Sequence, residues 1–554
     1  MPTAAAICPI CTSRKMYYAF SVQRSRLVEC RDCGHMMLHP PPSHAELNPI
    51  QDESYGFLDG SARPYMELVK RCLGRHGGRL LQIGCGAGEL LAVAADLGYD
   101  VTGVENSERA CAKARARLGG RGRVIHGGIV GGPRLRADQE PAPPNTATAP
   151  VLIEENYFDV CVIADVIECT QDPRAFLERV YQAVRLGGIV LIATPSLQSW
   201  PARLMKDKWT EFQSGRLHYF TQETLHSLLF QMGLDPIAAF SGRQNPANRA
   251  PAAFRTKTFQ IAASGMISVS VKVPRTPQRR LSVIVPAYNE AATLEPVLRS
   301  VLEKKLDGVE KELVIVESNS SDGTRDIVLK YRDCPGVKVV LEDRARGKGH
   351  AVRTGLAHAT GDYILIQDGD REYDIEDYDV LIEPLVSGAK AFILGSRHGG
   401  RTWKVRRFKG KPFTGTLLNF GHWFFKTLVN LVLRLRLDDP FTMYKVFRRD
   451  CIAGLSFECN RFDFDYELLI KIVRKGYRPA EIPVNYRSRS FSEGKKVSVA
   501  RDPWTWVRAI FKYRWAEMDV IQGWRTSLTP NAAEDAAVRH PAWTEAPAKG
   551  VAGR

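Results

Sequence analysis

Residues 363–374 read YILIQDGDREYD, and this stretch decides the fold of the second half of the chain. A mostly apolar run, typical of a buried strand, leads directly into four acidic residues within residues 368–374. Carboxylates so close together repel one another unless a cation or a ligand neutralises them. Alone, an Asp-Gly-Asp is most often a solvated turn. Here Asp368, Asp370 and Glu372 alternate along an extended chain, so their side chains can share one face, and such oxygen ligands suit Mg²⁺ or Mn²⁺.

Two further apolar runs precede this one, and each also ends in a polar loop. They read LSVIVPAYNE from residue 281 and ELVIVESNSSDGT from residue 312. Strands that alternate with helical stretches indicate a parallel α/β sheet, whose loops meet at one edge. A separate series of the same kind begins at residue 79 with RLLQIGCGAGELLAVAADLGYDVTGVE, which reads strand, glycine turn, helix, and a second strand ending at Glu105. The sequence therefore predicts two α/β domains.

The glycine turn of the first series consists of Gly84, Gly86 and Gly88. Glycines between a strand and a helix let the backbone approach a ligand closely, and they expose the helix N-terminus to it. Glu105 ends the next strand, where a carboxylate can accept hydrogen bonds from both hydroxyls of a ribose. These features fit S-adenosylmethionine and NAD equally, so other residues must distinguish the two.

Four of the twelve cysteines form two C-x2-C hooks, CPIC at 8–11 and CRDC at 30–33, separated by 18 residues. Cys8, Cys11, Cys30 and Cys33 can present four thiolates in a tetrahedron, which predicts a structural Zn²⁺ site. The alternative is two reduced pairs without metal. A catalytic zinc is not expected, because sulfur would occupy all four positions.

Composition sets broad limits on function. A chain of 554 residues requires two or three domains, and 44% hydrophobic with 25% charged residues is ordinary for a globular protein. The net charge of +16 calls for an anionic partner: nucleic acid, a membrane surface or a phosphorylated substrate. Nucleic acid is not expected, because basic residues and stacking aromatics are not organised together over the domains. We expect neither a secretory signal nor a membrane-spanning helix.

The first α/β series resembles class I S-adenosylmethionine-dependent methyltransferases over about residues 80–240. Besides the glycine turn, the resemblance lies in YFDVCVIADVIECTQDP from residue 157, VRLGGIVLIATPS and RLHYFTQETLHSLLFQMGLD. It implies that the glycine turn lines the methionine part of the cofactor, that Glu105 holds its ribose and that Asp165 faces the methyl donor. His218 is the best-placed candidate for a catalytic base. Gln82 departs from the family, which usually has an acid there.

The second series resembles family 2 glycosyltransferases, particularly polyprenol-phosphate sugar synthases, from Leu281 to about Val499. The motifs are VIVPAYNE, VESNSSDGT, RGKGHAVRTG, QDGD, GSRH, DDPFTMYKVFRRD and FDFDYELLIKIVRKGYRPAEIPVNYRSRSFSEGKK. The resemblance implies that a nucleotide sugar is bound by Pro286, Tyr288, Glu290, Glu317, Ser318, Lys348 and Asp368. A lipid phosphate acceptor, already an oxyanion, would be placed by Arg397, Arg487, Arg489 and Lys495. Glu317 and Ser318 stand where two aspartates are usual.

Residues 415–437, GTLLNFGHWFFKTLVNLVLRLRL, read as an amphipathic helix. The polar residues recur at spacings of three and four, and six cations without an acid precede the helix at residues 401–411. Such a helix can lie in the interface of an anionic bilayer, or it can pack on its own domain. The family resemblance favours the membrane. The predicted polar stripe is Asn419, His422, Lys426, Asn430 and Arg434.

Together these features predict a bifunctional enzyme with a zinc-ribbon-like module, a Rossmann-like methyltransferase and a GT-A glycosyltransferase. It would transfer a sugar to a polyprenyl phosphate at the cytoplasmic face of the membrane and methylate a glycan-pathway acceptor. The alternative is a glycosyltransferase acting on a hydroxyl acceptor, with a non-catalytic front half. The polar linker predicts separable domains. The predicted boundaries are 1–45 (zinc module), 46–271 (methyltransferase, with an unstructured insertion at 127–150), 272–280 (linker), 281–524 (glycosyltransferase) and 525–554 (disordered tail).

Overall fold

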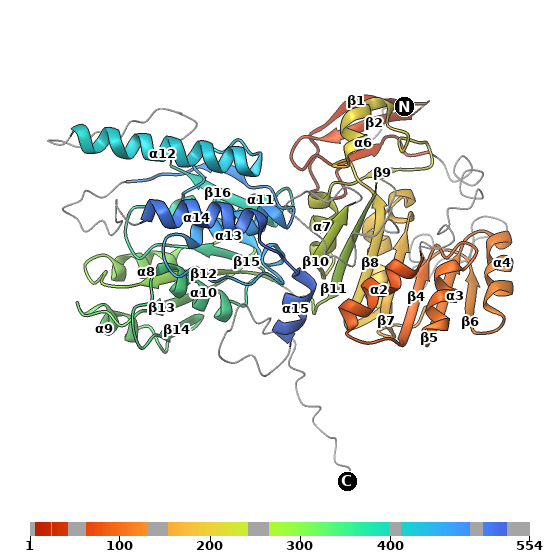
Figure 1. Cartoon of the computed structure of the whole chain (residues 1–554), viewed down its shortest axis with the longest axis horizontal. Coiled ribbons are helices and arrows are strands. Elements are labelled where there is room, and N and C mark those ends of the chain that lie inside the picture. The colour runs from red at the N-terminus through yellow and green to blue at the C-terminus, as the bar shows by residue number, and fades with distance from the viewer. Residues whose placement is uncertain are drawn as a thin grey trace, which may run out of the picture.

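The computed structural model describes residues 6–23, 25–42, 62–129, 153–241, 265–276, 278–397, 412–487 and 502–528. Two α/β halves lie side by side, and a small cysteine-rich sheet covers one end of the first half (Figure 1). The predicted fold class, two α/β domains preceded by a small cysteine module, is confirmed.

The cysteine module, residues 6–42, is built on a four-stranded antiparallel sheet. Three of its strands are β1 (Met16–Val22), β2 (Ser25–Cys30) and β3 (Met36–Leu38). The fourth, β9 (His218–Tyr219), comes from the first α/β half and pairs with β3. The module is therefore joined to that half by backbone hydrogen bonds.

The first half is a seven-stranded sheet in the order β10-β11-β8-β7-β4-β5-β6. The strands from β8 to β6 are parallel, whereas β10 and β11 are antiparallel. The strands are β4 (Gly78–Ile83), β5 (Tyr99–Glu105), β6 (Gly122–His126), β7 (Phe158–Ala164), β8 (Val184–Pro195), β10 (Leu234–Ser241) and β11 (Gly265–Lys272). The helices are α2 (Ala62–Leu73), α3 (Glu89–Asp96), α4 (Glu108–Leu118), α5 (Pro173–Ala183), α6 (Trp200–Met205) and α7 (Gln222–Gln231), with short 3₁₀ turns η1 (Ile167–Cys169) and η2 (Lys206–Lys208).

The second half is another seven-stranded sheet, in the order β14-β13-β12-β15-β17-β16-β18. Strands β12 to β15 are parallel, and β17 runs antiparallel to both neighbours. The strands are β12 (Arg279–Ala287), β13 (Val309–Glu317), β14 (Val337–Leu341), β15 (Tyr363–Ile366), β16 (Phe392–Ser396), β17 (Lys445–Arg448) and β18 (Ala480–Pro483). The helices and 3₁₀ turns are α8 (Leu294–Glu303), α9 (Thr324–Leu329), α10 (Lys348–His358), η4 (Ile375–Asp377), α11 (Tyr378–Val386), α12 (Pro412–Leu433), η5 (Arg449–Cys451), α13 (Phe464–Arg474), α14 (Asp502–Trp515) and α15 (Val520–Leu528).

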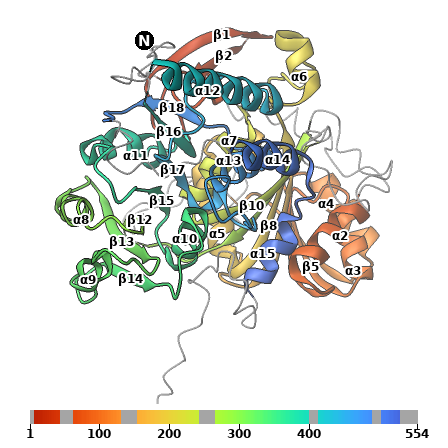
Figure 2. The same cartoon turned by 60° about the vertical axis from the view of Figure 1, so that its left-hand side comes forward.

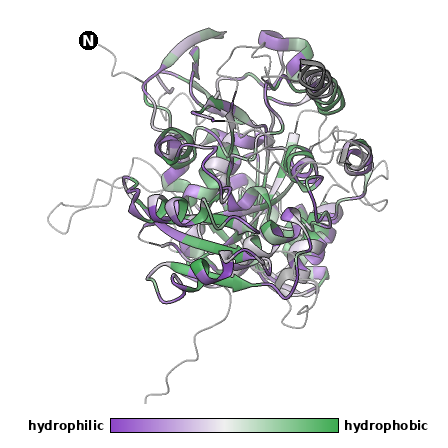
Figure 3. Cartoon of the chain, turned by 90° about the vertical axis from the view of Figure 1, so that its left-hand side faces the viewer, coloured by the Kyte–Doolittle hydropathy of each residue, from purple (hydrophilic) through white to green (hydrophobic). Residues whose placement is uncertain are grey.

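The central strands of both sheets are almost continuously apolar, because helices cover both faces. Figure 3 shows the same contrast: hydrophobic residues colour the interior strands, and hydrophilic residues alternate with them along the outer helices. Ridges of Val, Ile and Leu from the strands pack against the inner faces of the helices. The polar loops that carry the predicted sites therefore project from a rigid apolar scaffold.

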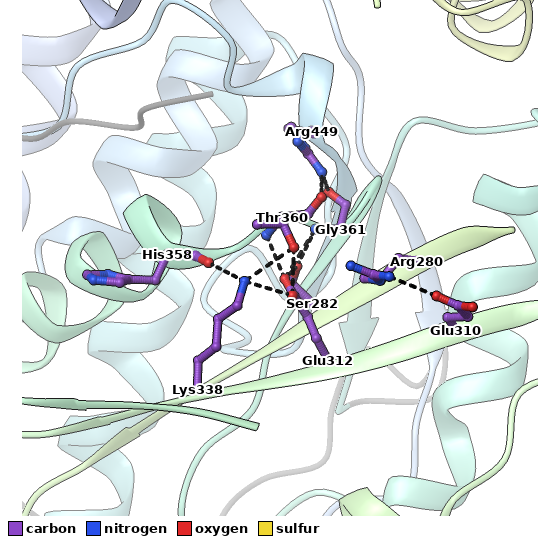
Figure 4. Close-up of polar contacts among 9 residues, drawn as sticks. All are labelled: Arg280, Ser282, Glu310, Glu312, Lys338, His358, Thr360, Gly361 and Arg449. Carbon is purple, nitrogen blue, oxygen red and sulfur yellow. Dashed lines mark hydrogen bonds and ion pairs between the residues drawn. The ribbon is translucent and has the colours of Figure 1, made fainter. Parts of the chain in front are cut away.

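One buried carboxylate ties together the start of the second sheet (Figure 4). Glu312 of β13 accepts hydrogen bonds from the side chain of Ser282 in β12 and from the backbone and hydroxyl of Thr360, just before β15. Lys338 of β14 pairs with the same carboxylate at 3.0 Å. Glu312 thus links four parallel strands at the end of the sheet opposite to the acidic loops.

The two halves are joined by a buried polar interface rather than only by the connection between β11 and β12. The imidazole of His226 in α7 lies 2.9 Å from the hydroxyl of Tyr477. Ser227 donates to the carbonyl of Gly388 and accepts from Arg448, whose side chain is fully buried. Buried, hydrogen-bonded groups thus contribute to the contact between the halves. The predicted separability of the two domains stays a prediction.

Helix α15 crosses back from the second half to the first (Figure 2). Ile521 and Trp524 are buried in the same core as α2 of the first half. Arg71 of α2 pairs with Asp519 at 2.7 Å, next to this helix. The C-terminal segment thus fastens one half to the other, and part of it lies beyond residue 524, where the sequence predicted a tail.

Candidate functional site

The four cysteines of the two hooks converge. Their sulfur atoms all lie within 4.8 Å of one another, and among the described residues they form the one cluster of three or more potential metal ligands. Three of the four side chains are buried. Four thiol ligands at this separation have the chemistry and the number that structural Zn²⁺ requires. From the first α/β half, Arg174 and Gln231 both donate hydrogen bonds to the carbonyl of Ile10, inside the first hook.

The glycine turn follows β4, as predicted, and all three glycines have positive φ. The amide of Gly86 donates to Oε2 of Glu105 at 2.8 Å, and Ser107 N–H donates to the other oxygen at 3.0 Å. Glu105 is thus fixed at the end of β5 beside the turn, and its remaining lone pairs can accept ribose hydroxyls. Gln82, two residues before Gly84, is fully buried, and its side-chain amide has no hydrogen-bond partner.

The structure places Asp165 and His218 very differently. Asp165 follows β7 in a left-handed conformation, with φ of 54°, beside the glycine turn. His218 lies in β9, buried, with its ring 3.2 Å from that of His35 in the cysteine module. Burial lowers the pKa of His218 to about 4. The His218 ring is therefore packed and neutral in the contact with the cysteine module. Its predicted role as a catalytic base stays a prediction.

The two loops predicted to bind a nucleotide in the second half are linked to each other. In the first loop Pro286 is half-buried and Tyr288 is exposed, and the Glu290 amide donates to Thr324 in the second. Glu317 is buried; its carboxylate accepts from the Ser320 amide and pairs with Arg325.

Ser318 donates to Glu342, a carboxylate that the sequence did not single out. Glu317 and Ser318 therefore shape the loop through internal contacts. Arg325 and Glu342, which make those contacts, have no signal of their own in the sequence.

The acidic segment (Asp368, Asp370 and Glu372) follows β15 at the edge where the nucleotide loops lie. Asp368 pairs with Lys348 at the start of α10, so these two predicted residues do come together. Asp370 is buried and accepts a hydrogen bond from the Glu372 amide at 3.1 Å.

The Glu372 carboxylate instead accepts from the hydroxyl of Tyr486 at 2.7 Å. The predicted shared face is therefore corrected: the three carboxylates do not form a cluster like that of the cysteines. Asp368 and Asp370 both lie near the ammonium group of Lys348, and two such carboxylates suit Mg²⁺ or Mn²⁺ shared with a diphosphate.

The predicted acceptor-binding arginines are only partly described. Arg397 makes a two-pronged ion pair with Asp439, at 2.6 and 2.7 Å, and its guanidinium lies 5.3 Å from the ring of Tyr486. Asp439 holds the pKa of Arg397 well above its usual range, although burial opposes this. Arg487 is exposed, and its amide donates to the Glu372 carbonyl. Arg489 and Lys495 lie outside the described residues.

Two side chains of the polar stripe predicted on α12 bind the segment that follows this helix. Lys426 pairs with Asp438 at 2.9 Å, and Asn430 forms two hydrogen bonds with the backbone of Leu437. These side chains hold the segment that leads to Asp439, whereas Arg434 is exposed. The side chains of Asn419 and His422, and the cations at residues 401–411, lie outside the described residues.

Large hydrophobic side chains are exposed on α12 and on its neighbour α14. On α14 they recur at helical spacing, which the sequence analysis missed. No helix in the described ranges is long and apolar enough to span a bilayer. The exposed set, called here the aromatic face, is Trp423, Phe424 and Leu431 on α12 and Trp504, Phe511 and Trp515 on α14.

Two family models match the chain, one in each half. Residues 282–454 match Glycosyl transferase family 2, and residues 58–239 match Methyltransferase domain. The first match includes the acidic segment and Arg397, and the second includes the glycine turn, Glu105 and Asp165. The chain is therefore a fusion of a methyltransferase domain and a family 2 glycosyltransferase domain.

Several relatives are similar to part of the chain. A dolichyl-phosphate beta-glucosyltransferase from Trichomonas vaginalis is 29% identical over 233 residues, which is 40% of this chain and 68% of that protein. A dolichol-phosphate mannosyltransferase from Pyrococcus furiosus is 27% identical over 216 residues, 39% of this chain and 59% of that protein. A solved structure of glucosyl-3-phosphoglycerate synthase from Mycobacterium tuberculosis is 22% identical and covers 44% of this chain and 81% of its own, with a TM-score of 0.31.

Proposed function

We propose that the second half transfers a sugar from a nucleotide sugar to a lipid phosphate, and that the first half methylates an acceptor of the same glycan pathway with S-adenosylmethionine. The observation that carries the first part is the grouping of Asp368 and Lys348 with buried Asp370, at the edge where the loops of β12 and β13 meet. Carboxylates beside a cation are what a metal-bound diphosphate needs.

In this proposal the acceptor phosphate needs positioning rather than deprotonation. Its oxyanion attacks the anomeric carbon, and the bond from that carbon to the nucleotide diphosphate breaks. A bound Mg²⁺ or Mn²⁺ would neutralise charge on the departing diphosphate, with Asp368 and Asp370 as its ligands. Arg397, fixed by Asp439, offers a cation on the same side of the sheet. That two of the relatives carry dolichyl or dolichol phosphate in their names supports this acceptor class.

The test uses purified protein, a panel of nucleotide sugars and short polyprenyl phosphates, with the product followed by mass. A sugar-phosphate-lipid product is expected. Transfer only to a hydroxyl acceptor would favour the second candidate, which requires a catalytic base. Separately, binding of labelled S-adenosylmethionine is expected at the glycine turn. If none binds, the first half is a scaffold.

We further propose that the protein attaches peripherally to the cytoplasmic face of the membrane. The aromatic face on α12 and α14 supports this location, because interfacial helices bury such side chains among lipid headgroups. The four converging cysteines would bind one structural Zn²⁺. Domain boundaries near residue 45 and at residues 272–280 remain our proposal for where the functional units divide.

A further inference from the structure

A second acidic grouping lies in the first half, close to the glycine turn. Asp165 and Glu168 both contact one guanidinium: Oδ1 of Asp165 is 3.9 Å from Arg216, and Oε1 of Glu168 is 4.0 Å from it. Arg216 also pairs with Glu211. One cation therefore faces three carboxyl groups. In a site where only 8% of the Arg216 side chain is exposed, three full negative charges would be poorly compensated.

Glu168 is the member that is least able to carry a charge. Its side chain is 1% exposed. One oxygen accepts a hydrogen bond from Thr194 at the end of β8, at 2.9 Å, whereas Oε1 has no hydrogen-bond partner. Burying a carboxyl group with an oxygen that lacks a hydrogen-bond partner costs much less free energy when the group is protonated and neutral. Burial, reinforced by the charge of Asp165, raises the pKa of Glu168 to about 8.

Asp165 is the member that faces outward. It ends β7, the strand adjacent to β4, and the side chain of its neighbour Val166 stands directly against Gly84 of the glycine turn. Nearly half of its side chain is exposed, at 46%. Its φ of 54° is unusual for a residue other than glycine, and its backbone N–H donates a hydrogen bond to the carbonyl of Ala193 at 3.0 Å. Strain of this kind is common where a side chain is held for function.

We propose that Asp165 and Glu168 form an acid pair that shares one proton beside Arg216, with Asp165 as the base for methyl transfer and Glu168 as its positioning residue. The inference rests on the proposed methyltransferase function and names its substrate class: a hydroxyl or amine that loses a proton on methylation. The O–H or N–H bond breaks, its proton goes to Asp165 and its electron pair bonds the methyl group. The electrons of the C–S bond return to sulfur, which becomes neutral.

Other ionisable groups face the pair from every element packed around it. They are Cys169 from η1, Arg216 and Glu211 from the loop after η2, Tyr219 from β9 and Tyr65 from α2. Burial raises the pKa of each of these thiol and phenol groups, so they stay uncharged near neutral pH. The proton shared by the acid pair is thus the one expected to move between pH 6 and 9.

The first test needs no methyl acceptor. The affinities of cationic S-adenosylmethionine and neutral S-adenosylhomocysteine are measured by calorimetry from pH 6 to 9. In the unaltered protein the preference for the cation should rise roughly tenfold with pH, as the pair gains a second negative charge. In Glu168→Gln the preference should not vary, because only Asp165 remains. A constant preference in the unaltered protein would overturn the proposal, and no binding of either compound would overturn the methyltransferase function instead.

The second test works even if no cofactor binds. The folded state holds the Glu168 proton up to about pH 8, whereas an unfolded glutamate loses it near pH 4.5. Between these values the folded state binds more protons, so its stability falls as pH rises. The melting temperature of the unaltered protein should therefore fall relative to that of Glu168→Gln as pH rises. The difference, variant minus unaltered protein, should increase by several degrees between pH 5 and pH 9. For the control Glu155→Gln, at an exposed position, this difference should not change with pH. Equal gains for both variants would refute the shared proton.

Discussion

The imidazole Nδ1 of His226 lies 2.9 Å from the hydroxyl of Tyr477, although 251 residues separate them in the chain. The same hydroxyl donates to Asp450 at 2.6 Å. Both side chains are buried, and burial lowers the pKa of His226 to about 3, so the contact holds a neutral imidazole at physiological pH. Buried, hydrogen-bonded side chains thus join the methyltransferase domain to the glycosyltransferase domain.

Removing this hydroxyl tests whether the domains unfold together. Tyr477→Phe removes the hydroxyl that binds Nδ1 of His226 and one hydrogen bond of Asp450, which keeps its ion pair with Arg448; this should lower the free energy of unfolding by about 1–3 kcal/mol. Calorimetry should show one transition that shifts as a whole. Tyr288→Phe, at an exposed position, is the control and should change little. Two transitions, with only one shifted, would contradict a single unit.

Zinc content is the second prediction. The purified protein should contain about one zinc per chain, and Cys30→Ser should lose it, because three thiolates bind far more weakly than four. Loss of zinc should also loosen Ile10, whose carbonyl Arg174 and Gln231 hold, and so raise hydrogen exchange in the first hook. Cys334→Ser, outside the cluster, should keep its metal. Zinc-free protein prepared without chelator would contradict the site.

The third prediction concerns the acidic segment. Asp370→Asn keeps the volume but removes one charged ligand, so sugar transfer should fall by about two orders of magnitude or more while the fold persists. Chelator should reproduce the loss, and Mg²⁺ or Mn²⁺ should restore only the unaltered protein. Asp374→Asn is a matched control in the same run, because Asp374 caps η4 and asparagine caps nearly as well. Full transfer in chelator would rule out a metal role.

Acid sensitivity gives the fourth prediction. Burial alone would raise the pKa of Glu312, but hydrogen bonds from Ser282 and Thr360 and the charge of Lys338 lower it to about 2. An unfolded glutamate titrates near 4.5, so the unfolded state binds the proton first. The ionised carboxylate therefore stabilises the fold fully above about pH 4.5. As pH falls towards 2 this contribution disappears, which lowers the free energy of unfolding by roughly 3 kcal/mol.

Denaturant titrations of unaltered protein and Glu312→Gln between pH 7 and 2.5 check this sign. The two stabilities should converge as pH falls, because the variant has no charge to lose. Glu310→Gln is the control, since Glu310 pairs with Arg280 at the surface. A constant difference across this range would show that the network does not depend on the carboxylate charge.

The sequence predicts those features that depend on local order. The glycine turn, the two cysteine hooks and the position of Asp368 after β15 all follow from residues close together in the chain. The sequence does not show which distant residues contact the predicted side chains. His218 has a base-like pattern, but His35, 183 residues away, packs against it. Glu372 alternates with its acidic neighbours, yet Tyr486 binds its carboxylate. Such pairs are set by tertiary packing, which local spacing does not encode.

The interface between the domains was missed for a related reason. A short polar connection suggests independence, but the free energy of the contact resides in buried groups such as Arg448 and Ser227, which look unremarkable in sequence. The amphipathic pattern of α12 was detected, whereas the orientation of that helix was not. Lys426 and Asn430 bind the following loop, and the helix buries some hydrophobic residues in the core while it exposes others.

The membrane prediction now has two separable parts, of which the first is electrostatic. Arg406, Arg407 and Lys409 precede α12, and each cation near an anionic surface contributes roughly 1 kcal/mol before screening. Replacing all three by Gln should weaken sedimentation with anionic vesicles at low salt. Sedimentation at high salt should change much less, because salt already screens these charges.

The second part is hydrophobic and depends on the aromatic face of α14. Trp504, Phe511 and Trp515 recur at helical spacing, and Trp504 is 78% exposed. Their insertion among headgroups is indifferent to screening, and each contributes about 1–2 kcal/mol even when partly buried. Changing all three to Ser should therefore abolish the binding that survives high salt, and lower turnover on long-chain lipid phosphate more than on a short-chain one. Leu186→Ser, an exposed apolar residue on the methyltransferase domain, should do neither. If the triple variant sediments as well as the unaltered protein at every salt concentration, this face does not meet the membrane.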